Sequence, residues 1–303
     1  MKKCLVIGAA MLDIIMEVRR LPKTGQDIYV SKQSMNVGGC AYNVANILEH
    51  FGVPSTLLAP VGEGIYGKFI GEALRKTNHM SPISVEDADN GYCLCMVEEN
   101  GERTFVTVPG VECEFRKEWF ERLDLEEYDS VYVSGYEIEG SGGEVIIEFL
   151  ENHRELMLYY APGPRITYIE KEKTERMDKL SAIVHLNEAE ALAHTRKKSV
   201  QEAAKELFSR TQNTVIITVG EKGAYLYEKG EGKFVNTKHV PVVDTIGAGD
   251  SHMGTIIAVR KLGYDYQLAV EKANQVSGLV VGEKGSTLTR EKFEKGRILL
   301  WEK

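Results

Sequence analysis

Residues 242–255 read Val-Val-Asp-Thr-Ile-Gly-Ala-Gly-Asp-Ser-His-Met-Gly-Thr, and this stretch decides which fold and which chemistry the rest of the chain must support. A strand end meets a Gly-Ala-Gly turn, and an amphipathic helix follows. The small residues Gly247, Ala248 and Gly249 allow backbone N–H groups to approach a ligand at the start of that helix. Unpaired amides and the helix dipole stabilise an anion there, typically a phosphate.

Asp250 follows the turn directly and lies inside the predicted anion site. A carboxylate repels phosphate, so Asp250 is a poor phosphate ligand but a suitable base for a hydroxyl proton beside the phosphate. The alternative is that Asp250 caps the helix, a role that Asp often fills. Taken alone, the residue pattern leaves both interpretations open.

Upstream of this segment, apolar strands alternate with amphipathic helices. That alternation predicts an α/β fold, in which a parallel sheet has helices on both faces. The predicted strands span 3–7, 57–61, 130–133, 156–160, 183–186 and 215–219. The predicted helices include 66–75, 143–152, 188–195 and 200–210, and the charged stretch 170–176 is interpreted as a solvated helix face.

Two segments depart from the alternation, because 26–33 and then 92–98 with 104–108 look like strands without intervening helices. Asn100-Gly101, between the latter two, is a strong hairpin signal. A sheet this small is only marginally stable alone, so it must pack on something. We therefore expect one domain over 1–303 with lid strands inserted at about 26–36 and 91–108. A lid shared between two subunits, in a homodimer, would also satisfy the packing requirement.

Composition excludes several classes of partner. The 303 residues include 45 acidic and 37 basic side chains, for a formal charge of −8, which disfavours nucleic acid and membrane surfaces as partners. No stretch approaches about 18 consecutive apolar residues, so no membrane span is expected. The five cysteines show no paired metal-ligand spacing, and free thiols in a reducing cytoplasm are expected.

A second motif, Asn36-Val-Gly-Gly-Cys-Ala-Tyr-Asn-Val-Ala, precedes an early helix. Gly38 and Gly39 allow close backbone approach, and Asn43 lies one turn inside the helix, where its side chain can reach the same point. Asp13 closes the first strand region, and a carboxylate at the carboxyl end of a strand lies where parallel α/β sheets bind ligands.

The combination is informative, since Gly-Gly-x-x-x-Asn-x-Ala at 38–45 and Asp-Thr-x-Gly-Ala-Gly-Asp at 244–250 resemble the two signatures of the PfkB, or ribokinase-like, carbohydrate kinase family. Asn187-Glu-Ala-Glu190 and Thr218-Val-Gly-Glu-Lys-Gly223 resemble the family's Asn-x-x-Glu motif and nucleotide-binding turn, and Glu283-Lys-Gly-Ser its late glycine loop. The resemblance extends over nearly the whole chain. It implies a ribokinase-like three-layer sandwich, with a mostly parallel central sheet and a small β-sheet lid.

For catalysis, the resemblance implies that Asp250 is the base and that the amides of Gly247, Ala248 and Gly249 form an anion hole for the transferred phosphoryl group. It also implies a set of residues that hold the hydroxyls of the acceptor. We assign to this set Asp13, Gly38, Gly39 and Asn43, with Met11 and Arg103 as further candidates. For Arg103 the competing interpretation is a solvated residue on a lid strand.

For the nucleotide, the resemblance implies ATP as phosphoryl donor, with Mg²⁺ organised through water by Asn187 and Glu190. The competing interpretation is a turn residue and a first-turn acid that the helix dipole favours. The residues expected along the nucleotide are Asn187, Thr218, Gly220, Gly223 and Asn274. In many members a monovalent cation sits beside the anion hole, and the resemblance leaves open whether K⁺ binds here. The matching positions are Asp244, Ile246, Val280, Glu283, Gly285 and Thr289.

The implied reaction is ATP-dependent phosphorylation of a hydroxymethyl group on a sugar, with a nucleoside as the alternative acceptor. Ribose-specific members have Asn two residues before the first acidic contact, whereas this chain has Met11, which adapts to apolar surfaces. Tyr42 and Tyr92 could stack on a nucleobase or simply pack the lid. A dinucleotide-dependent dehydrogenase is disfavoured because 8–13 lacks Gly-x-Gly-x-x-Gly, and the intact Gly-Ala-Gly-Asp disfavours a binding protein without turnover.

Overall fold

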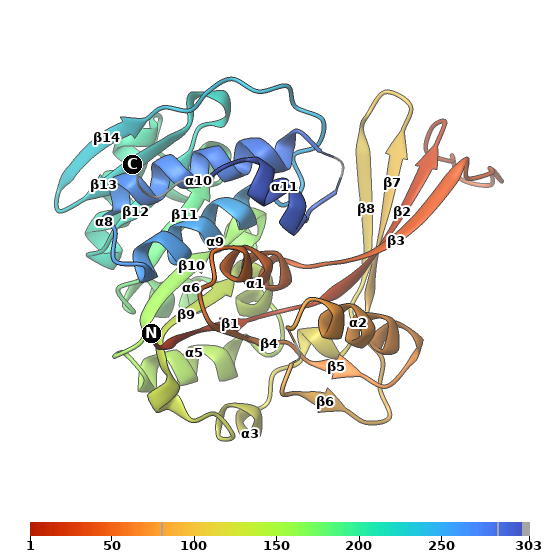
Figure 1. The fold of residues 1–303 in the computed structure, drawn as a ribbon, viewed down its shortest axis with the longest axis horizontal. Helices are drawn as coiled ribbons and strands as arrows, with labels where there is room; N and C mark the ends of the chain where they lie inside the picture. Colours follow the sequence, from red (N-terminus) through yellow and green to blue (C-terminus); the bar gives the residue numbers. More distant parts are fainter. Residues whose placement is uncertain (80, 284, 299–303) are drawn as a thin grey trace.

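The centre of the molecule is an eight-stranded sheet in the order β14-β13-β12-β11-β10-β9-β1-β4, seen in a computed structural model of the chain (Figure 1). The structure describes residues 1–79, 81–283 and 285–298, so residues 80, 284 and 299–303 of the expected domain lie outside it. The strands are β1 (Lys3–Ile7), β4 (Ser55–Leu58), β9 (Tyr128–Ser134), β10 (Met157–Ala161), β11 (Ile183–Asn187), β12 (Val215–Thr218), β13 (Ala224–Glu228) and β14 (Glu231–Val235).

From β12 to β4 all neighbouring strands pair in parallel, as the alternation of strands and helices predicts. Only β13 and β14, which the sequence pattern did not reveal, are antiparallel at one edge. Alternate residues of a strand enter the apolar cores on opposite faces: Leu5 and Ile7 pack on one side of the sheet, and Cys4 and Val6 on the other. Burial on both faces explains why these strands are continuous apolar runs.

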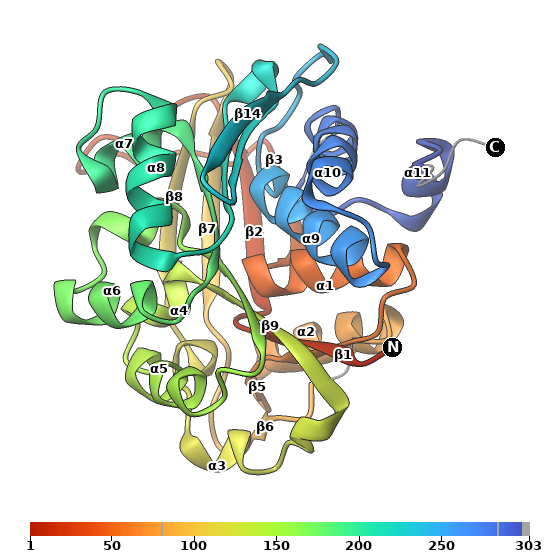
Figure 2. The same cartoon turned by 90° about the vertical axis from the view of Figure 1, so that its left-hand side faces the viewer.

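The helices form a layer on each face of the sheet (Figure 2). One core includes side chains from α3 to α8, and the other includes side chains from α1, α2, α9 and α10. The helices are α1 (Cys40–His50), α2 (Ile65–Lys76), α3 (Lys117–Phe120), α4 (Gly135–Glu139), α5 (Gly143–Asn152), α6 (Lys171–Asp178), α7 (Glu188–Thr195), α8 (Val200–Thr211), α9 (Ala248–Lys261), α10 (Tyr266–Val281) and α11 (Arg290–Lys295). The predicted helices are confirmed, with α5 and α7 at the predicted bounds.

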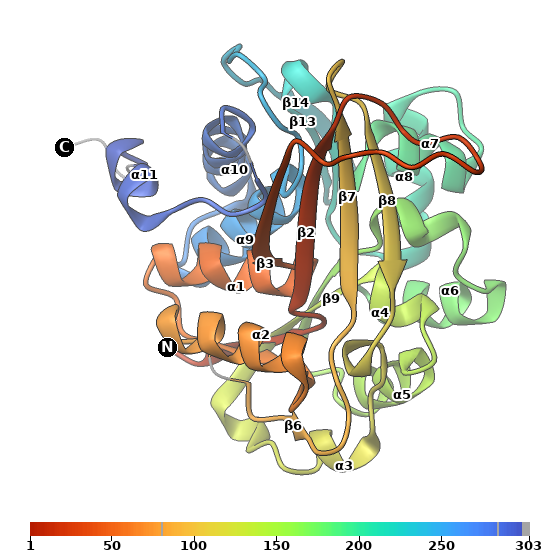
Figure 3. The same ribbon diagram turned by 90° about the vertical axis from the view of Figure 1, so that its right-hand side faces the viewer.

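A separate four-stranded sheet in the order β3-β2-β7-β8 stands beside the main domain (Figure 3). Its strands are β2 (Met11–Val18), β3 (Lys32–Gly38), β7 (Tyr92–Glu98) and β8 (Arg103–Val108), and we call this sheet the lid. The hairpin predicted at Asn100-Gly101 joins β7 and β8. A two-stranded sheet of β5 (Val61–Gly62) and β6 (Ser84–Val85) completes the strands in the described residues.

Two predictions about the lid were wrong. The strand expected at 26–33 begins only at Lys32, because 26–30 pair with no strand. Asp13 does not close the first strand, which ends at Ile7; it lies inside β2. Asp13 and Glu17 lie on the same face of β2, and polar residues two or four apart are typical of a half-buried strand rather than of a strand end.

No helix within the described ranges is long and apolar enough to cross a membrane.

Candidate active site

The first turn of α9 is an open helix N-terminus. Gly247, its N-cap, has a φ of 74° and gives no side-chain cap. A Cβ on Gly247 would lie 2.2 Å from the carbonyl oxygen of Ser286, so the turn needs glycine and packs directly on the late glycine loop. The Ala248 N–H reaches the Thr245 carbonyl at 3.3 Å. The next N–H groups, of Gly249 and Asp250, have no acceptor within the helix and are available to an anion.

Asp250 connects the two distant motifs. Nδ2 of Asn43 on α1 donates a hydrogen bond to Oδ2 of Asp250 at 2.8 Å, across 207 residues of sequence. Burial raises the pKa of Asp250, while hydrogen bonds from Asn43 and the Cys40 thiol oppose that rise. The Asp250 carboxylate is thus held by another helix. This arrangement favours the interpretation as a base.

The Gly-Gly pair lies against the lid carboxylate. A Cβ on Gly38 would lie 2.1 Å from Oδ2 of Asp13, and one on Gly39, whose φ is 105°, would lie 2.5 Å from the Ala9 carbonyl oxygen. Met11 is the strand partner of Gly38. Burial raises the pKa of Asp13 to about 6, and no hydrogen-bond donor for this carboxylate is found in the part of the chain that the structure describes. Asp13 is therefore suited to receive a hydroxyl from an acceptor.

Two residues on α4 belong to this site and were missed from the sequence. Glu137 is buried, and its carboxylate accepts hydrogen bonds from Ser134 Oγ at 2.5 Å and from the Ala9 N–H at 3.1 Å. Tyr136, 51% exposed, has its pKa raised to about 12 by burial and by the nearby Cys40 and Asp250. The rule that ligands bind at carboxyl ends of parallel strands points to α4, since β9 ends beside β1.

At the carboxyl end of β11, Asn187 and Glu190 form a reciprocal capping box at the start of α7. The Asn187 side chain accepts from the Glu190 N–H and the Glu190 carboxylate accepts from the Asn187 N–H, both at 2.9 Å. Only Oε2 of Glu190 takes part, so its other oxygen remains for a hydrated ion. In the described parts of the chain no three His, Cys, Asp or Glu side chains cluster as metal ligands. Mg²⁺ bound with a nucleotide needs only one or two carboxylates beside phosphates and water, so these residues fit it.

The predicted nucleotide turn follows β12, beside β11. Thr218 ends β12, and Gly220 and Gly223 adopt φ values of 62° and 93° around a short 3₁₀ turn (Gly220–Lys222). A Cβ on Gly223 would lie 2.2 Å from the Val235 carbonyl oxygen. The turn thus holds the backbone close to the end of β14.

Asn274 is buried in α10, and its amide is engaged inside the protein. Oδ1 lies 3.1 Å from Nε2 of His252, and Nδ2 donates to the Val235 carbonyl at 2.9 Å. Nδ1 of His252 in turn lies 2.9 Å from Nε2 of His185. These contacts place Asn274 beneath the end of β14, and its expected position near the adenine stays a prediction.

The predicted monovalent cation site, which the family resemblance implies is formed largely by backbone carbonyls, includes the carboxylate of Asp244, and this carboxylate already has partners in the chain. Asp244 forms an ion pair with Arg103, and its carboxylate also accepts from the N–H groups of Ile246 and Gly285, both at 2.9 Å. Burial would raise the pKa of Asp244, but the hydrogen bonds from these three residues outweigh it and lower the pKa.

Three further groups of that predicted cation set, two side chains and one backbone carbonyl, also have partners in the chain. Glu283 is paired with Lys292 at 2.6 Å, Thr289 caps α11 through its hydroxyl, and the Val280 carbonyl accepts from the Glu283 N–H at 3.1 Å. Arg103 is thus paired with Asp244 rather than a solvated strand residue, and its expected role in holding an acceptor stays a prediction.

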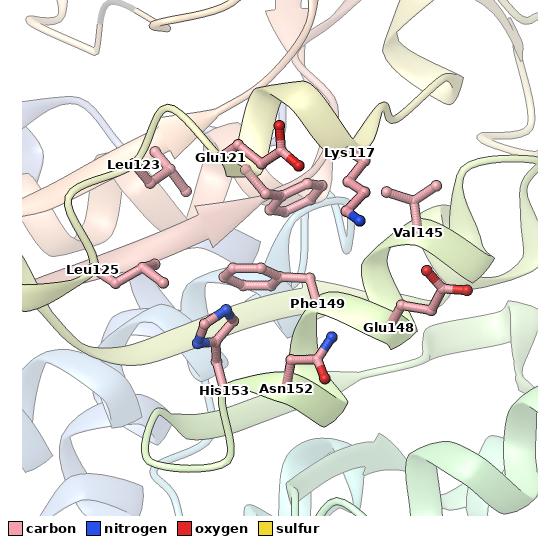
Figure 4. A pocket seen from close by; sticks show the side chains of 10 residues that line it. Lys117, Glu121, Leu123, Leu125, Val145, Glu148, Phe149, Asn152 and His153 are labelled. Atoms are coloured by element: carbon pink, nitrogen blue, oxygen red, sulfur yellow. The ribbon is translucent and has the colours of Figure 1, made fainter.

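A partly open cavity of about 210 Å³ lies away from all these groups, between α3 and α5 (Figure 4). Its lining includes Phe120, Phe149 and His153, and none of the predicted site residues. His153 precedes β10, so the cavity is at the amino ends of the strands, whereas the predicted site residues gather at the carboxyl ends.

An open helix N-terminus beside a buried carboxylate, with a second carboxylate on a lid, has the groups that phosphoryl transfer on an α/β scaffold requires. The chain belongs to the pfkB family of carbohydrate kinases, whose model matches residues 1–292. It is 33% identical to an uncharacterised sugar kinase, YegV, of Escherichia coli K12, over 93% of this chain and 89% of that protein.

Two solved structures share the fold. Ribokinase from Thermotoga maritima superposes with a TM-score of 0.85 at 22% identity, covering 98% of this chain and 99% of that one. Adenosine kinase from Sinorhizobium meliloti superposes with a TM-score of 0.84 at 20% identity, covering 98% of each chain.

Proposed function

We propose that the chain transfers the γ-phosphoryl group of ATP to a hydroxymethyl group of a sugar. The observation that carries the proposal is the contact between Asn43 and Asp250, which brings the acceptor motif and the anion-site motif to one point. The family is one of carbohydrate kinases, and the relative YegV is described as a sugar kinase.

In the proposed mechanism the acceptor hydroxyl lies between Asp250 and the anion hole. Asp13 and Asn43 orient the acceptor by hydrogen bonds, and Oδ1 of Asp250, which Asn43 leaves free, takes the hydroxyl proton as the oxygen attacks phosphorus. The N–H groups at the start of α9 stabilise the charge that develops on the transferred group. The lid excludes water, which would otherwise compete as the attacking nucleophile.

On the donor side, Asn187 and Glu190 would hold hydrated Mg²⁺, which when bound neutralises charge on the phosphates. Thr218, Gly220 and Gly223 line the nucleotide in this proposal.

A nucleoside is the second candidate acceptor. The side-chain contacts of Tyr42 and Tyr92 support it less than the sequence pattern alone did. Tyr42 is buried with its ring against His79 at 6.2 Å, and Tyr92 packs on Tyr66 at 5.0 Å, so both rings are used in packing. Tyr136 is the exposed aromatic beside Asp250 and can cover either a sugar ring or a base.

The test is a panel of pentoses, hexoses, sugar acids and nucleosides, each assayed for acceptor-dependent conversion of ATP to ADP with product identification by mass spectrometry. Phosphorylation of free sugars but not nucleosides supports the proposal. Turnover of nucleosides alone would replace the sugar with the second candidate, and no acceptor-dependent turnover at all would contradict both.

We also propose that two lids pair in a homodimer. The lid strands carry exposed apolar side chains, namely Met35, Val106 and Val108. Covering such side chains with a partner lowers the free energy of the assembly. Sedimentation equilibrium should show a dimer that Val106→Glu dissociates. A strict monomer at high concentration would contradict the pairing.

A further inference from the structure

Arg103 opens β8 at the hairpin end of the lid and reaches across to the main domain. Its guanidinium forms an ion pair with Asp244, the first residue of the anion-site motif. The side chain of Asp244 is only 5% exposed and that of Arg103 21% exposed, so the pair is largely withdrawn from water. Removing one partner of such a pair leaves an uncompensated buried charge, which is strongly unfavourable.

The carboxylate of Asp244 joins three segments that are far apart in the sequence. Oδ1 accepts from Arg103 of the lid and from the N–H of Ile246, which precedes the anion-hole glycine, Gly247. Oδ2 accepts from the N–H of Gly285, in the late glycine loop. Since Gly247 packs on Ser286 of the same loop, this one carboxylate fixes both sides of the turn that begins α9.

We propose that Arg103 is a positioning residue that supplies the fixed positive charge at Asp244 and assembles the anion hole when the lid is in place. The arginine thereby makes a dissociable monovalent cation at Asp244 unnecessary for turnover. Arg103 does not touch the reacting atoms; it acts through Asp244 on the N–H groups at the start of α9. This inference rests on the proposed role of the residues 247–249 as the anion hole.

Steady-state kinetics separates this role from a simple fastening of the lid. A fastener would alter how well the acceptor is enclosed and would raise KM. A positioning charge acts on the N–H groups that stabilise developing charge, so its loss lowers kcat with a smaller change in KM for the acceptor.

The decisive variant is Arg103→Gln, assayed with the acceptor that the sugar and nucleoside panel identifies, in tetramethylammonium chloride. Because a misplaced catalytic group can cost about 10²-fold, we expect kcat to fall about 100-fold. Guanidinium or K⁺ chloride at constant ionic strength should restore part of the loss, whereas wild type should not respond to either salt. Arg103→Lys, which keeps the charge, should need no added cation, and Lys32→Gln, which removes an exposed charge from the lid, should behave as wild type.

A second readout needs no acceptor. Amide hydrogen exchange over 244–249 in the free protein should be faster in Arg103→Gln than in wild type, and K⁺ or guanidinium should slow it again. Unchanged exchange in the variant, or a wild-type enzyme that requires K⁺, overturns the inference. Absence of any kinase activity in the wild type would instead contradict the proposed function, so the two failures are distinguishable.

Discussion

Two helices, α7 and α9, carry an acidic residue at the same third position and use it in opposite ways. In α7, Glu190 turns back onto the N–H of Asn187 and closes the helix end. In α9, the N-cap is a glycine without a side chain, and Asp250 is held instead by Asn43 of another helix. The comparison shows that an acid at the third position of a helix closes the helix end in α7, whereas in α9 it is held by another helix and is left for the proposed role as a base.

The two helices are physically connected. His185 lies on β11, which leads into α7, and His252 lies on α9 two residues after Asp250. Nε2 of His185 and Nδ1 of His252 lie 2.9 Å apart, and both side chains are buried. A buried hydrogen bond between two imidazoles thus links the strand that leads into the capped helix to the uncapped helix.

The largest expected effect is on Asp250→Asn, which keeps the size of the side chain but removes the base. Turnover should fall about 10²–10⁴-fold while the circular dichroism spectrum and Tm stay close to those of wild type, because a general base typically contributes that much. If turnover stayed near normal, Asp250 would have a structural role like that of Glu190, and the proposed difference between α7 and α9 would be wrong.

The second prediction concerns acid, and it tests the connection between the helices. Burial lowers the pKa of His252 from 6.5 to about 4, so the folded protein binds fewer protons than the unfolded chain below pH 6.5. The stabilisation is therefore complete above pH 6.5 and is lost as the pH falls towards 4, by at most about 3 kcal/mol.

Urea unfolding measured from pH 7.5 to 4 should show this loss in wild type. His252→Asn should be less stable at pH 7.5 but should lose less stability on acidification, and the difference between the two chains isolates the histidine from the carboxylates that titrate in the same range. Parallel pH curves would contradict the assignment.

A smaller effect is expected for Asn43→Ala, which leaves Asp250 without its amide donor. Since that hydrogen bond lowers the pKa of Asp250, its loss raises the pKa further, and the acidic limb of kcat/KM should move to higher pH. At neutral pH kcat/KM should fall about tenfold, the order expected for a hydrogen bond to a charged group. An acidic limb that stays in place would mean that Asp250 is not the titrating base.

The smallest effects are expected at α7, where they sharpen the comparison. Asn187→Ala removes the cap and should lower the free energy of unfolding by about 1 kcal/mol. Glu190→Gln keeps a side-chain oxygen for the Asn187 N–H, so stability should hold. If Glu190 also serves a hydrated Mg²⁺, this variant should need more Mg²⁺ for half-maximal turnover with KM for the acceptor unchanged. An identical Mg²⁺ titration would leave Glu190 with its capping role alone.

Much of the fold follows from the sequence because the central strands are buried on both faces and read as apolar runs. β1 and β11 lie where the pattern predicts them, and so do α5 and α7. The lid strands were harder to predict from the sequence, since a half-buried strand such as β2 mixes polar and apolar residues and resembles a loop.

The site was predictable where motifs carry backbone requirements, and unpredictable where side chains meet across the fold. Gly247 and Gly39 need positive φ, which only glycine adopts easily, so their chemistry is visible in one sequence. The ion pair of Arg103 with Asp244 spans 141 residues and follows no local rule. Glu137 and Tyr136 were missed for the same reason, as each is placed by the order of strands in the sheet.

The contact of Asn43 with Asp250 has a consequence for the order in which the protein is made. During synthesis the proposed acceptor side, including Asp13 and Asn43, leaves the ribosome some 200 residues before Asp250, the proposed base that completes it. Strand β1 is made first, yet it lies between β4 and β9 and must wait for β9 to be paired on both sides. Contacts this distant in sequence are slow to form, so the nascent chain should expose apolar strand surface until α9 emerges, and a release before that point should yield an inactive, aggregation-prone product.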